Sequence, residues 1–160
     1  MKRKFKICSL LAITAILVCT LVSCFGGVDG SGIATILVDA GDGEYAEYSV
    51  DLSKLENVDE GAVSLLEYLS MDKRVDLRYT VESSAYGAYI TSINQIIPDP
   101  LSEYIAIYTS EASDFSVSAD GMEMPSIKHG DVELQYSGVG LSDMTVKDGT
   151  VILLRLESFS

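Results

Sequence analysis

The chain has 160 residues, of which 48% are hydrophobic, and a formal net charge of −13. This length suits one folded domain, and the apolar content excludes a wholly disordered chain. The 24 acidic residues outnumber the 11 basic ones, which argues against sequence-independent nucleic-acid binding through basic patches. One His, three Cys and no Trp leave few residues for metal binding or nucleophilic catalysis.

The first 23 residues have the pattern of a secretory signal peptide. Lys2, Arg3, Lys4 and Lys6 form a basic start, and residues 7–22 carry no charge. As a helix these 16 uncharged residues span roughly 24 Å, whereas a bilayer-spanning helix needs about 20 residues. A short apolar segment after a basic start is typical of a signal peptide. We therefore predict an exported protein.

The signal sequence ends in the letters LVSC, which resemble the bacterial lipobox. In that motif a small residue precedes a Cys whose thiol receives a diacylglycerol, and cleavage leaves the lipidated Cys as the first residue. By this resemblance Cys24 is the lipidation site, and the protein is attached to the extracytoplasmic face of the cell membrane. Two acyl chains anchor a protein stably, whereas one does so only marginally. The alternative is an uncleaved signal anchor.

Cleavage before Cys24 makes the remaining chain more acidic. All 24 acidic residues but only seven of the 11 basic residues follow it, so the mature chain carries a charge of −17. Its only Cys is Cys24, which excludes an intrachain disulfide. Residues 24–32 are Gly-rich and are predicted to be a flexible tether. Residues 33–160 form the predicted folded domain.

The domain opens with a predicted β-hairpin and a helix. Residues 33–38 are a β-branched run, a Gly- and Asp-rich turn follows, and 45–52 resumes strand character. Asp59 is the predicted helix N-cap. The spacing of Val63, Leu66 and Leu69, together with Leu65, predicts a buried helical stripe that ends near residues 71–74.

The rest of the domain is predicted to be mostly β-structure. Pro98 and Pro100 break the chain between strands, and residues 110–131 are predicted to be a long polar connection. This order predicts an α+β fold in which one helix packs on one face of a mixed sheet, and its outline is that of a β-grasp. The remaining strands are predicted at 75–82, 86–93, 103–109, 132–136 and 151–156.

Three short motifs resemble a family of bacterial surface domains. Residues 83–94 (SSAYGAYITSIN), 104–110 (YIAIYTS) and 146–152 (VKDGTVI) are similar to motifs of the transcobalamin-like C-terminal domain, a family of unknown function. The resemblance covers residues 33–157 and implies a β-grasp fold and a planar ligand such as a corrinoid. Two departures are the absence of Trp and the presence of Gln95 where a Gly commonly follows the Asn.

The first of these motifs, residues 83–94, carries the predicted ligand-binding residues: Tyr86, Gly87, Tyr89, Ser92 and Asn94. Tyrosine combines an apolar ring with a polar tip and is common on binding surfaces. In a regular strand the two tyrosines would face opposite sides, so only one could enter a given pocket. The alternative is that all five are ordinary sheet and core residues.

Other polar clusters are weaker candidates. The acidic turn containing Asp39, Asp42 and Glu44 could hold Ca²⁺, but a turn that simply uses Asp and Gly explains it as well. The same holds for the acidic residues of 111–123. His129 lacks a recognised nucleophile and is read as a turn residue. The sequence therefore predicts no catalytic residues, no metal site and no cofactor.

These observations together predict a non-enzymatic, lipid-anchored binding module at the cell surface. Its expected partners are the membrane, through Cys24, and a small corrinoid-like ligand or a surface protein, but not nucleic acid. The alternative function is a protein–protein or cell-wall interaction domain without a small ligand. Aromatic residues enclosed in a concavity would favour the small ligand, and a flat patch or an unpaired strand edge would favour a protein.

Overall fold

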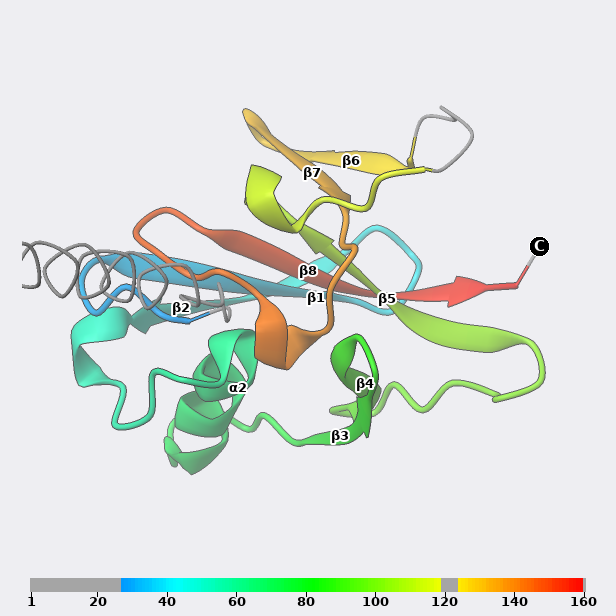
Figure 1. Cartoon of the computed structure of the whole chain (residues 1–160). Helices are drawn as coiled ribbons and strands as arrows, with labels where there is room; N and C mark the ends of the chain where they lie inside the picture. Colours follow the sequence, from blue (N-terminus) through cyan, green and yellow to red (C-terminus); the bar gives the residue numbers. More distant parts are fainter. Residues whose placement is uncertain (1–26, 119–123, 160) are drawn as a thin grey trace, which may run out of the picture.

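The computed structural model describes residues 27–118 and 124–159, so the predicted signal peptide and Cys24 lie outside the described residues (Figure 1). None of the helices in this part of the chain has the length and apolar character needed to cross a bilayer. Its α-helix is α2 (Gly61–Met71). Its strands are β1 (Ile33–Asp39), β2 (Tyr45–Asp51), β3 (Tyr79–Ser84), β4 (Gly87–Ile93), β5 (Glu103–Thr109), β6 (Ser126–His129), β7 (Val132–Tyr136) and β8 (Val151–Ser158).

Six strands form one mixed sheet in the order β2-β1-β8-β5-β7-β6. β1 pairs antiparallel with β2 and parallel with β8, and the other neighbours pair antiparallel. β3 and β4 form a separate antiparallel ladder. The predicted first hairpin is therefore confirmed, as is a mixed α+β architecture in which the described residues contain one α-helix.

One face of the large sheet is covered by α2 and the β3–β4 ladder (Figure 1). The predicted stripe of Val63, Leu65, Leu66 and Leu69 is buried there. It packs against aliphatic side chains of the sheet such as Ile36, which is fully buried. Burying a Leu or Ile side chain contributes roughly 1.5–3 kcal/mol, so this aliphatic cluster is the main core of the domain.

The opposite face is covered by the β6–β7 hairpin (Figure 1). At its rim the ring of His129 on β6 meets the ring of Tyr45 on β2 edge-on, with centroids 5.2 Å apart. β2 and β6 are the two ends of the strand order, so this contact shows that the sheet curls strongly. A second, smaller cluster is buried on this face: Leu37, Ala106, Tyr108, Leu134 and Leu153.

Strand β6 corrects the prediction that residues 110–131 form only a connection. Its four residues contain one apolar side chain, Ile127, which pairs with Leu134 of β7. A strand this short has no readable alternation, and it exists because β7 pairs with it. His129, expected in a turn, is the last residue of this strand, and the turn begins at Gly130 with φ +58°.

Two predicted boundaries are also wrong. The strand expected from residue 75 begins at Tyr79, because Asp72 accepts the Arg74 backbone N–H at 3.0 Å and holds a turn after the helix. Asp59 is not the helix cap, since α2 begins at Gly61. A Cβ at Gly61 would lie 2.6 Å from the Met144 carbonyl oxygen. The close approach of residues 141–144 therefore dictates where the helix starts.

Part of the predicted tether is fastened to the domain. The Val28 N–H donates to the Val58 carbonyl at 2.9 Å, and the Asp29 N–H donates to the Val146 carbonyl at 2.7 Å. Val28 is half-buried and packs against the main core. Residues 27–29 are therefore held in place rather than flexible, and the domain boundaries themselves stay predictions.

Candidate functional site

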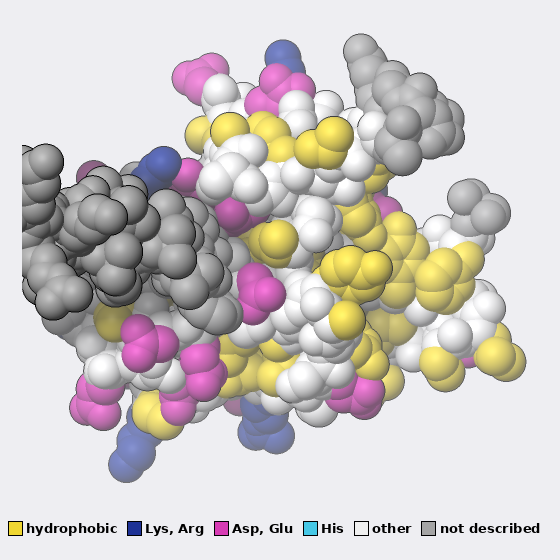
Figure 2. All heavy atoms as spheres, viewed as in Figure 1, with side chains coloured by type: hydrophobic (Ala, Val, Ile, Leu, Met, Phe, Trp, Pro, Cys, Tyr) yellow, Lys and Arg dark blue, Asp and Glu magenta, His cyan; other side chains and the backbone are white. Residues whose placement is uncertain are grey.

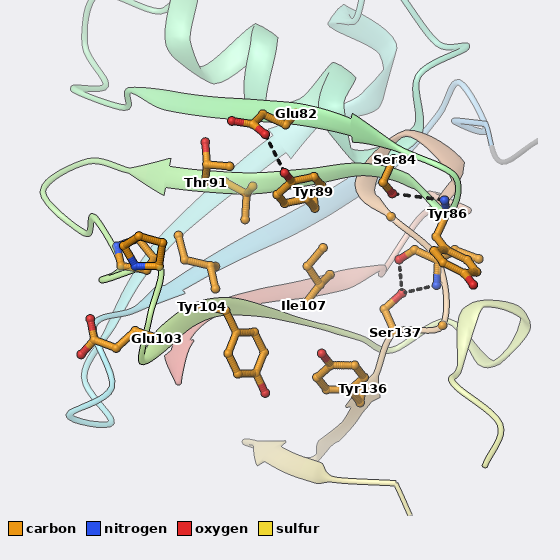
Figure 3. A pocket seen from close by; sticks show the side chains of 17 residues that line it. Glu82, Ser84, Tyr86, Tyr89, Thr91, Glu103, Tyr104, Ile107, Tyr136 and Ser137 are labelled. Carbon is orange, nitrogen blue, oxygen red and sulfur yellow. Dashed lines mark hydrogen bonds between the residues drawn. The ribbon is translucent and has the colours of Figure 1, made fainter. Parts of the chain in front are cut away.

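A cleft of about 600 Å³ opens between the β3–β4 ladder and strand β5 (Figure 3). The end of β7 and the residues after it complete the wall. We call it the tyrosine cleft because four tyrosine side chains line it. Its lining residues are Glu82, Ser84, Tyr86, Tyr89, Ile90, Thr91, Pro98, Pro100, Glu103, Tyr104, Ile105, Ile107, Tyr136, Ser137, Gly138, Val139 and Gly140.

Two of the predicted ligand residues, Tyr86 and Tyr89, line this cleft together. The expectation that they face opposite sides is wrong, because it assumed a regular strand through both. Tyr86 lies in the turn before β4, where Gly87 has φ +96°, so strand alternation starts only after it. The Tyr86 side chain is 77% exposed and that of Tyr89 is 43% exposed, so both rings are available at the mouth.

The facing wall carries Tyr104 from β5 and Tyr136 from β7 (Figure 3). The Tyr104 hydroxyl donates to a Glu157 carboxylate oxygen at 3.1 Å, and its ring stacks on Phe159 with centroids 5.0 Å apart. Burial is the main cause that raises the pKa of Tyr104 well above its usual value, and burial also raises the pKa of Tyr136. Both phenols are therefore neutral at physiological pH.

The charged groups that line the cleft are both carboxylates, Glu82 and Glu103. The Tyr89 hydroxyl donates to Glu82 at 2.6 Å, and this hydrogen bond raises the pKa of Tyr89 (Figure 3). Glu103 accepts the Asp99 backbone N–H at 3.0 Å. None of the described lining residues is Lys, Arg or His, so the cleft is aromatic and acidic.

Gly87 and its neighbours have a structural part. A Cβ at Gly87 would lie 3.0 Å from the Ser142 hydroxyl oxygen, in a backbone conformation that other residues rarely adopt. The same hydroxyl accepts the Ala88 N–H at 2.9 Å. Gly87 therefore lets the segment after β7 pack closely against the start of β4, and this contact sets the position of Tyr86.

Ser92 and Asn94 lie away from the tyrosine cleft. The Ser92 hydroxyl donates to the Thr80 hydroxyl at 3.0 Å. Asn94 has φ +54°, and its side-chain amide donates to the Tyr48 hydroxyl at 3.2 Å. Its amide oxygen accepts the Arg78 backbone N–H at 3.1 Å. Ser92 thus links the two strands of the β3–β4 ladder, and Asn94 holds the turn that follows β4.

Strand β5 presents an unpaired edge at the floor of the cleft. Among the described residues, β7 pairs with this edge only at Tyr108 and Thr109. The Ile107 carbonyl, which accepts the Ser137 N–H at 2.8 Å, points away from β8. Backbone direction alternates along an antiparallel strand, so the N–H and C=O of Ile105 also point away from β8.

The other acidic clusters have structural partners. Asp39 is fully buried, accepts the Gly41 and Gly43 N–H groups, and lies 3.2 Å from the Arg155 guanidinium. Within residues 27–118 and 124–159, no three His, Cys, Asp or Glu side chains converge to hold a metal ion. The acidic turn therefore closes the first hairpin.

The acidic residues after β5 likewise fasten the chain. Glu111 accepts the Thr150 hydroxyl at 2.8 Å and pairs with the Lys147 ammonium at 2.6 Å. Asp114 accepts the Thr145 backbone N–H at 2.7 Å. Both carboxylates are buried, and they tie this segment to the one that leads into β8.

Sequence reasoning missed the second half of the cleft. Tyr104 and Tyr136 both belong to predicted strands, and neither was predicted to bind a ligand. Glu82 and Glu103 carried no recognisable motif. The available signal was the count of nine tyrosines in a chain without Trp, but which of them share a surface depends on how the β3–β4 ladder docks.

Comparison with known proteins finds a similar fold among solved structures. No family model and no curated protein matches the chain. A crystal structure from Ruminococcus gnavus, described as "a putative metal binding protein", superposes with a TM-score of 0.53 at 16% sequence identity. The match covers 81% of this chain and 100% of that one. At this identity the similarity is one of fold.

Proposed function

We propose that this protein is a non-enzymatic binding module, anchored through Cys24 at the outer face of the membrane, whose tyrosine cleft binds a small planar ligand. A corrinoid is the first candidate, because the chain resembles the transcobalamin-like C-terminal domain. The observation that carries the proposal is the enclosure of Tyr86, Tyr89, Tyr104 and Tyr136 around one cleft.

The shape and chemistry of the cleft favour a small molecule over a flat protein surface. A volume of about 600 Å³ falls within the range of roughly 300–1,000 Å³ typical of ligand sites. Tyrosine rings give large apolar contact area at low conformational cost, and their hydroxyls give polar contacts at the rim. Hydrophobic side chains also gather over the end of the molecule where β4, β5 and the end of β8 lie (Figure 2).

The strand connectivity supports the finer proposal of a β-grasp fold. The first hairpin is followed by α2, and β1 lies beside the last strand, β8, in parallel. This is the arrangement expected of a hairpin crossed by a helix and closed by a later strand. β6 and β7 are then additions to that plan, folded over the second face.

A corrinoid would also make protein ligands for a metal unnecessary, since it carries its own cobalt. The structural neighbour is described as metal binding, and the described residues here hold no cluster of three metal-ligating side chains. A tetrapyrrole held by rings and rim contacts fits the residues that line this cleft.

A titration of the full chain with cobalamin tests the proposal. In an uncharged detergent, a ligand at about 100 times its dissociation constant raises the free energy of unfolding by about 2.7 kcal/mol, measured as a shift in melting temperature. Tyr86→Leu should weaken binding and Tyr86→Phe should preserve it, because the ring is the contact. No saturable shift with cobalamin or related tetrapyrroles would contradict the small-ligand proposal.

The unpaired edge of β5 favours a second candidate function, capture of an extended peptide. The free N–H and C=O of Ile105 could pair with an added strand, as in other β-augmentation complexes. A peptide whose alternate backbone amides are N-methylated cannot pair with this edge and should not be captured. A panel of synthetic peptides with and without N-methylation, scored by fluorescence anisotropy against the wild type, separates the two candidates.

Membrane anchoring is tested separately. Cys24→Ser removes the proposed acceptor thiol, so the protein should lose its lipid and accumulate as an unprocessed precursor. The measurement is mass spectrometry of the purified chain together with fractionation of membranes. Unchanged processing and unchanged lipid mass in the variant would rule out Cys24 as the lipidation site and favour the uncleaved signal anchor.

A further inference from the structure

We infer that the tyrosine cleft selects its ligand by charge, accepting a planar cation and rejecting a planar anion. This inference rests on the proposed function, because it assigns the charge class of the ligand that the cleft would hold. It follows from the carboxylates that line the cleft, from the placement of the basic residues and from the electronic state of two tyrosine rings.

The two lining carboxylates lie on opposite walls. Glu82 comes from β3 beside Tyr89, and Glu103 comes from β5 at the rim of the cleft, so a ligand in the cleft has both carboxylates at its border (Figure 3). The Glu82 side chain lies among exposed residues, and its one named partner is the neutral Tyr89 hydroxyl. Neither carboxylate has a Lys, Arg or His partner among the described lining residues, so their negative potential acts on a ligand in the cleft.

Basic residues are engaged elsewhere in the molecule. Five of the seven Lys and Arg residues after Cys24 pair with Asp or Glu outside the cleft. The nearest in sequence to a lining residue, Arg78, pairs with Asp76 at 3.4 Å. An anionic ligand in the cleft would meet carboxylates and find no compensating Lys or Arg among the described lining residues.

Two of the tyrosine rings have hydrogen bonds that make their faces more attractive to a cation. The Tyr89 hydroxyl donates to Glu82 at 2.6 Å, and the Tyr104 hydroxyl donates to Glu157 at 3.1 Å. A hydrogen bond donated to a carboxylate pushes electron density into the phenol ring. The ring face is the negative end of the aromatic quadrupole, so an electron-rich tyrosine attracts a cation more strongly and repels an anion.

The net charge acts in the same direction at longer range. The chain carries −13 in total, and a strongly acidic protein steers cations toward its surface and anions away. This long-range part is screened within about 8 Å at physiological salt. Selection that persists in high salt is therefore due to the contacts within the cleft.

Two tricyclic dyes of similar size and opposite charge test the inference. Methylene blue is a planar cation and resorufin is a planar anion at neutral pH. Each is titrated against the full chain in an uncharged detergent, with protein-free micelles as the blank, and binding is followed by dye absorbance and fluorescence. We expect methylene blue to bind at least about tenfold more tightly than resorufin, as an aromatic, acidic site should.

Isosteric variants locate the selection. Glu82→Gln and Glu103→Gln keep the side-chain shape, and each should weaken methylene blue binding by roughly two- to fivefold. Glu133→Gln on β7 removes the same charge from an exposed position outside the cleft and should leave the dissociation constant unchanged. Tyr86→Leu should weaken the binding of both dyes, because it removes an aromatic ring rather than a charge.

Each outcome bears on one proposal. Equal binding of the two dyes, or tighter binding of resorufin, overturns the charge inference and leaves a planar-ligand site. Saturable cobalamin binding with no methylene blue binding has the same meaning. If neither dye and no tetrapyrrole binds, the proposed function itself fails. Equal losses in Glu82→Gln and Glu133→Gln would show that net charge alone, and not the cleft, makes the selection.

Discussion

The two faces of the sheet are built from different side chains. The face under α2 and the β3–β4 ladder is aliphatic, with a large buried cluster of Leu, Ile, Val and Ala. The face under β6–β7 has a small buried cluster with Tyr108 at its centre and further tyrosines packed around it. Aliphatic side chains pack without polar partners, whereas tyrosines can pack with their rings and still reach polar partners.

This difference explains where the tyrosine cleft lies. The β3–β4 ladder covers one face and β6–β7 the other, and neither covers the outer edge of β5 between Glu103 and Ile107. The cleft opens at this gap, at the boundary of the two layers. The aliphatic face thus supplies the main core, whereas Tyr86 and Tyr89 stay exposed beside the gap.

The largest effect is expected in the aliphatic core. Leu66→Ala removes a fully buried side chain of α2 and should lower the free energy of unfolding by about 2–5 kcal/mol, because the cavity collapses only partly. Leu101→Ala is the matched control, since that side chain is 90% exposed, and it should change stability by less than about 0.5 kcal/mol. Urea denaturation measures both, and similar losses would contradict the contrast.

Gly87→Ala should have the next largest effect, because Gly87 joins the ladder to the segment after β7. An alanine there would strain the positive φ and crowd the Ser142 hydroxyl. Together these should lower the free energy of unfolding by about 1–3 kcal/mol. Gly43→Ala is the control, since Gly43 also has a positive φ but nothing lies within 4 Å of its added Cβ. A smaller loss in Gly43→Ala than in Gly87→Ala, in thermal unfolding, would isolate the contribution of the close packing.

A smaller effect is expected for the tyrosine cluster of the second face. Tyr108 donates its hydroxyl to Glu157 at 2.7 Å, and Tyr108→Phe should cost about 1–2 kcal/mol by removing this hydrogen bond. Burial, followed by this bond, raises the pKa of Tyr108 above its unfolded value near 10. The stability that protonated Tyr108 adds to the folded state is therefore complete below about pH 10, and it is lost as the pH rises through the folded pKa.

The pH dependence itself checks this assignment. Wild-type stability should fall more steeply than that of Tyr108→Phe above about pH 10, as seen in urea denaturation at a series of alkaline pH values. Tyrosinate absorbance should also appear at a higher pH in the native protein than in the urea-unfolded chain. Parallel pH curves for the two proteins would show that Tyr108 carries no special share of the stability.

The smallest effect on stability is expected at the mouth of the cleft. Tyr86 is 77% exposed, so Tyr86→Ala should change the free energy of unfolding by less than about 0.5 kcal/mol. The same change should weaken the binding of a planar ligand. A large drop in melting temperature would mean that Tyr86 supports the fold, and the tyrosine cleft would then lose its most exposed contact.

Local pattern was enough to predict most of the elements. The helical stripe of α2 follows from spacing, and the strands at Ile33–Asp39 and Glu103–Thr109 follow from β-branched or aromatic apolar runs of strand length. Pattern failed at β6, which is too short to show alternation, and at Asp59, where a tertiary contact of Gly61 sets the helix start. At Gly61 the deciding partner, Met144, is distant in sequence, whereas β6 pairs with the neighbouring β7 and is simply too short to be recognised.

By itself the sequence determined the chemistry available to the site: many tyrosines, an acidic balance, and a motif around Tyr86 and Tyr89. Only the tertiary structure decided which of these residues meet. Tyr89 and Tyr136 are brought to one cleft by the docking of the β3–β4 ladder beside β5, and Asn94 lies outside it, where its side chain bonds to Tyr48 and Arg78. Periodicity assigns a side chain to a face, but the packing of distant elements decides what lies opposite.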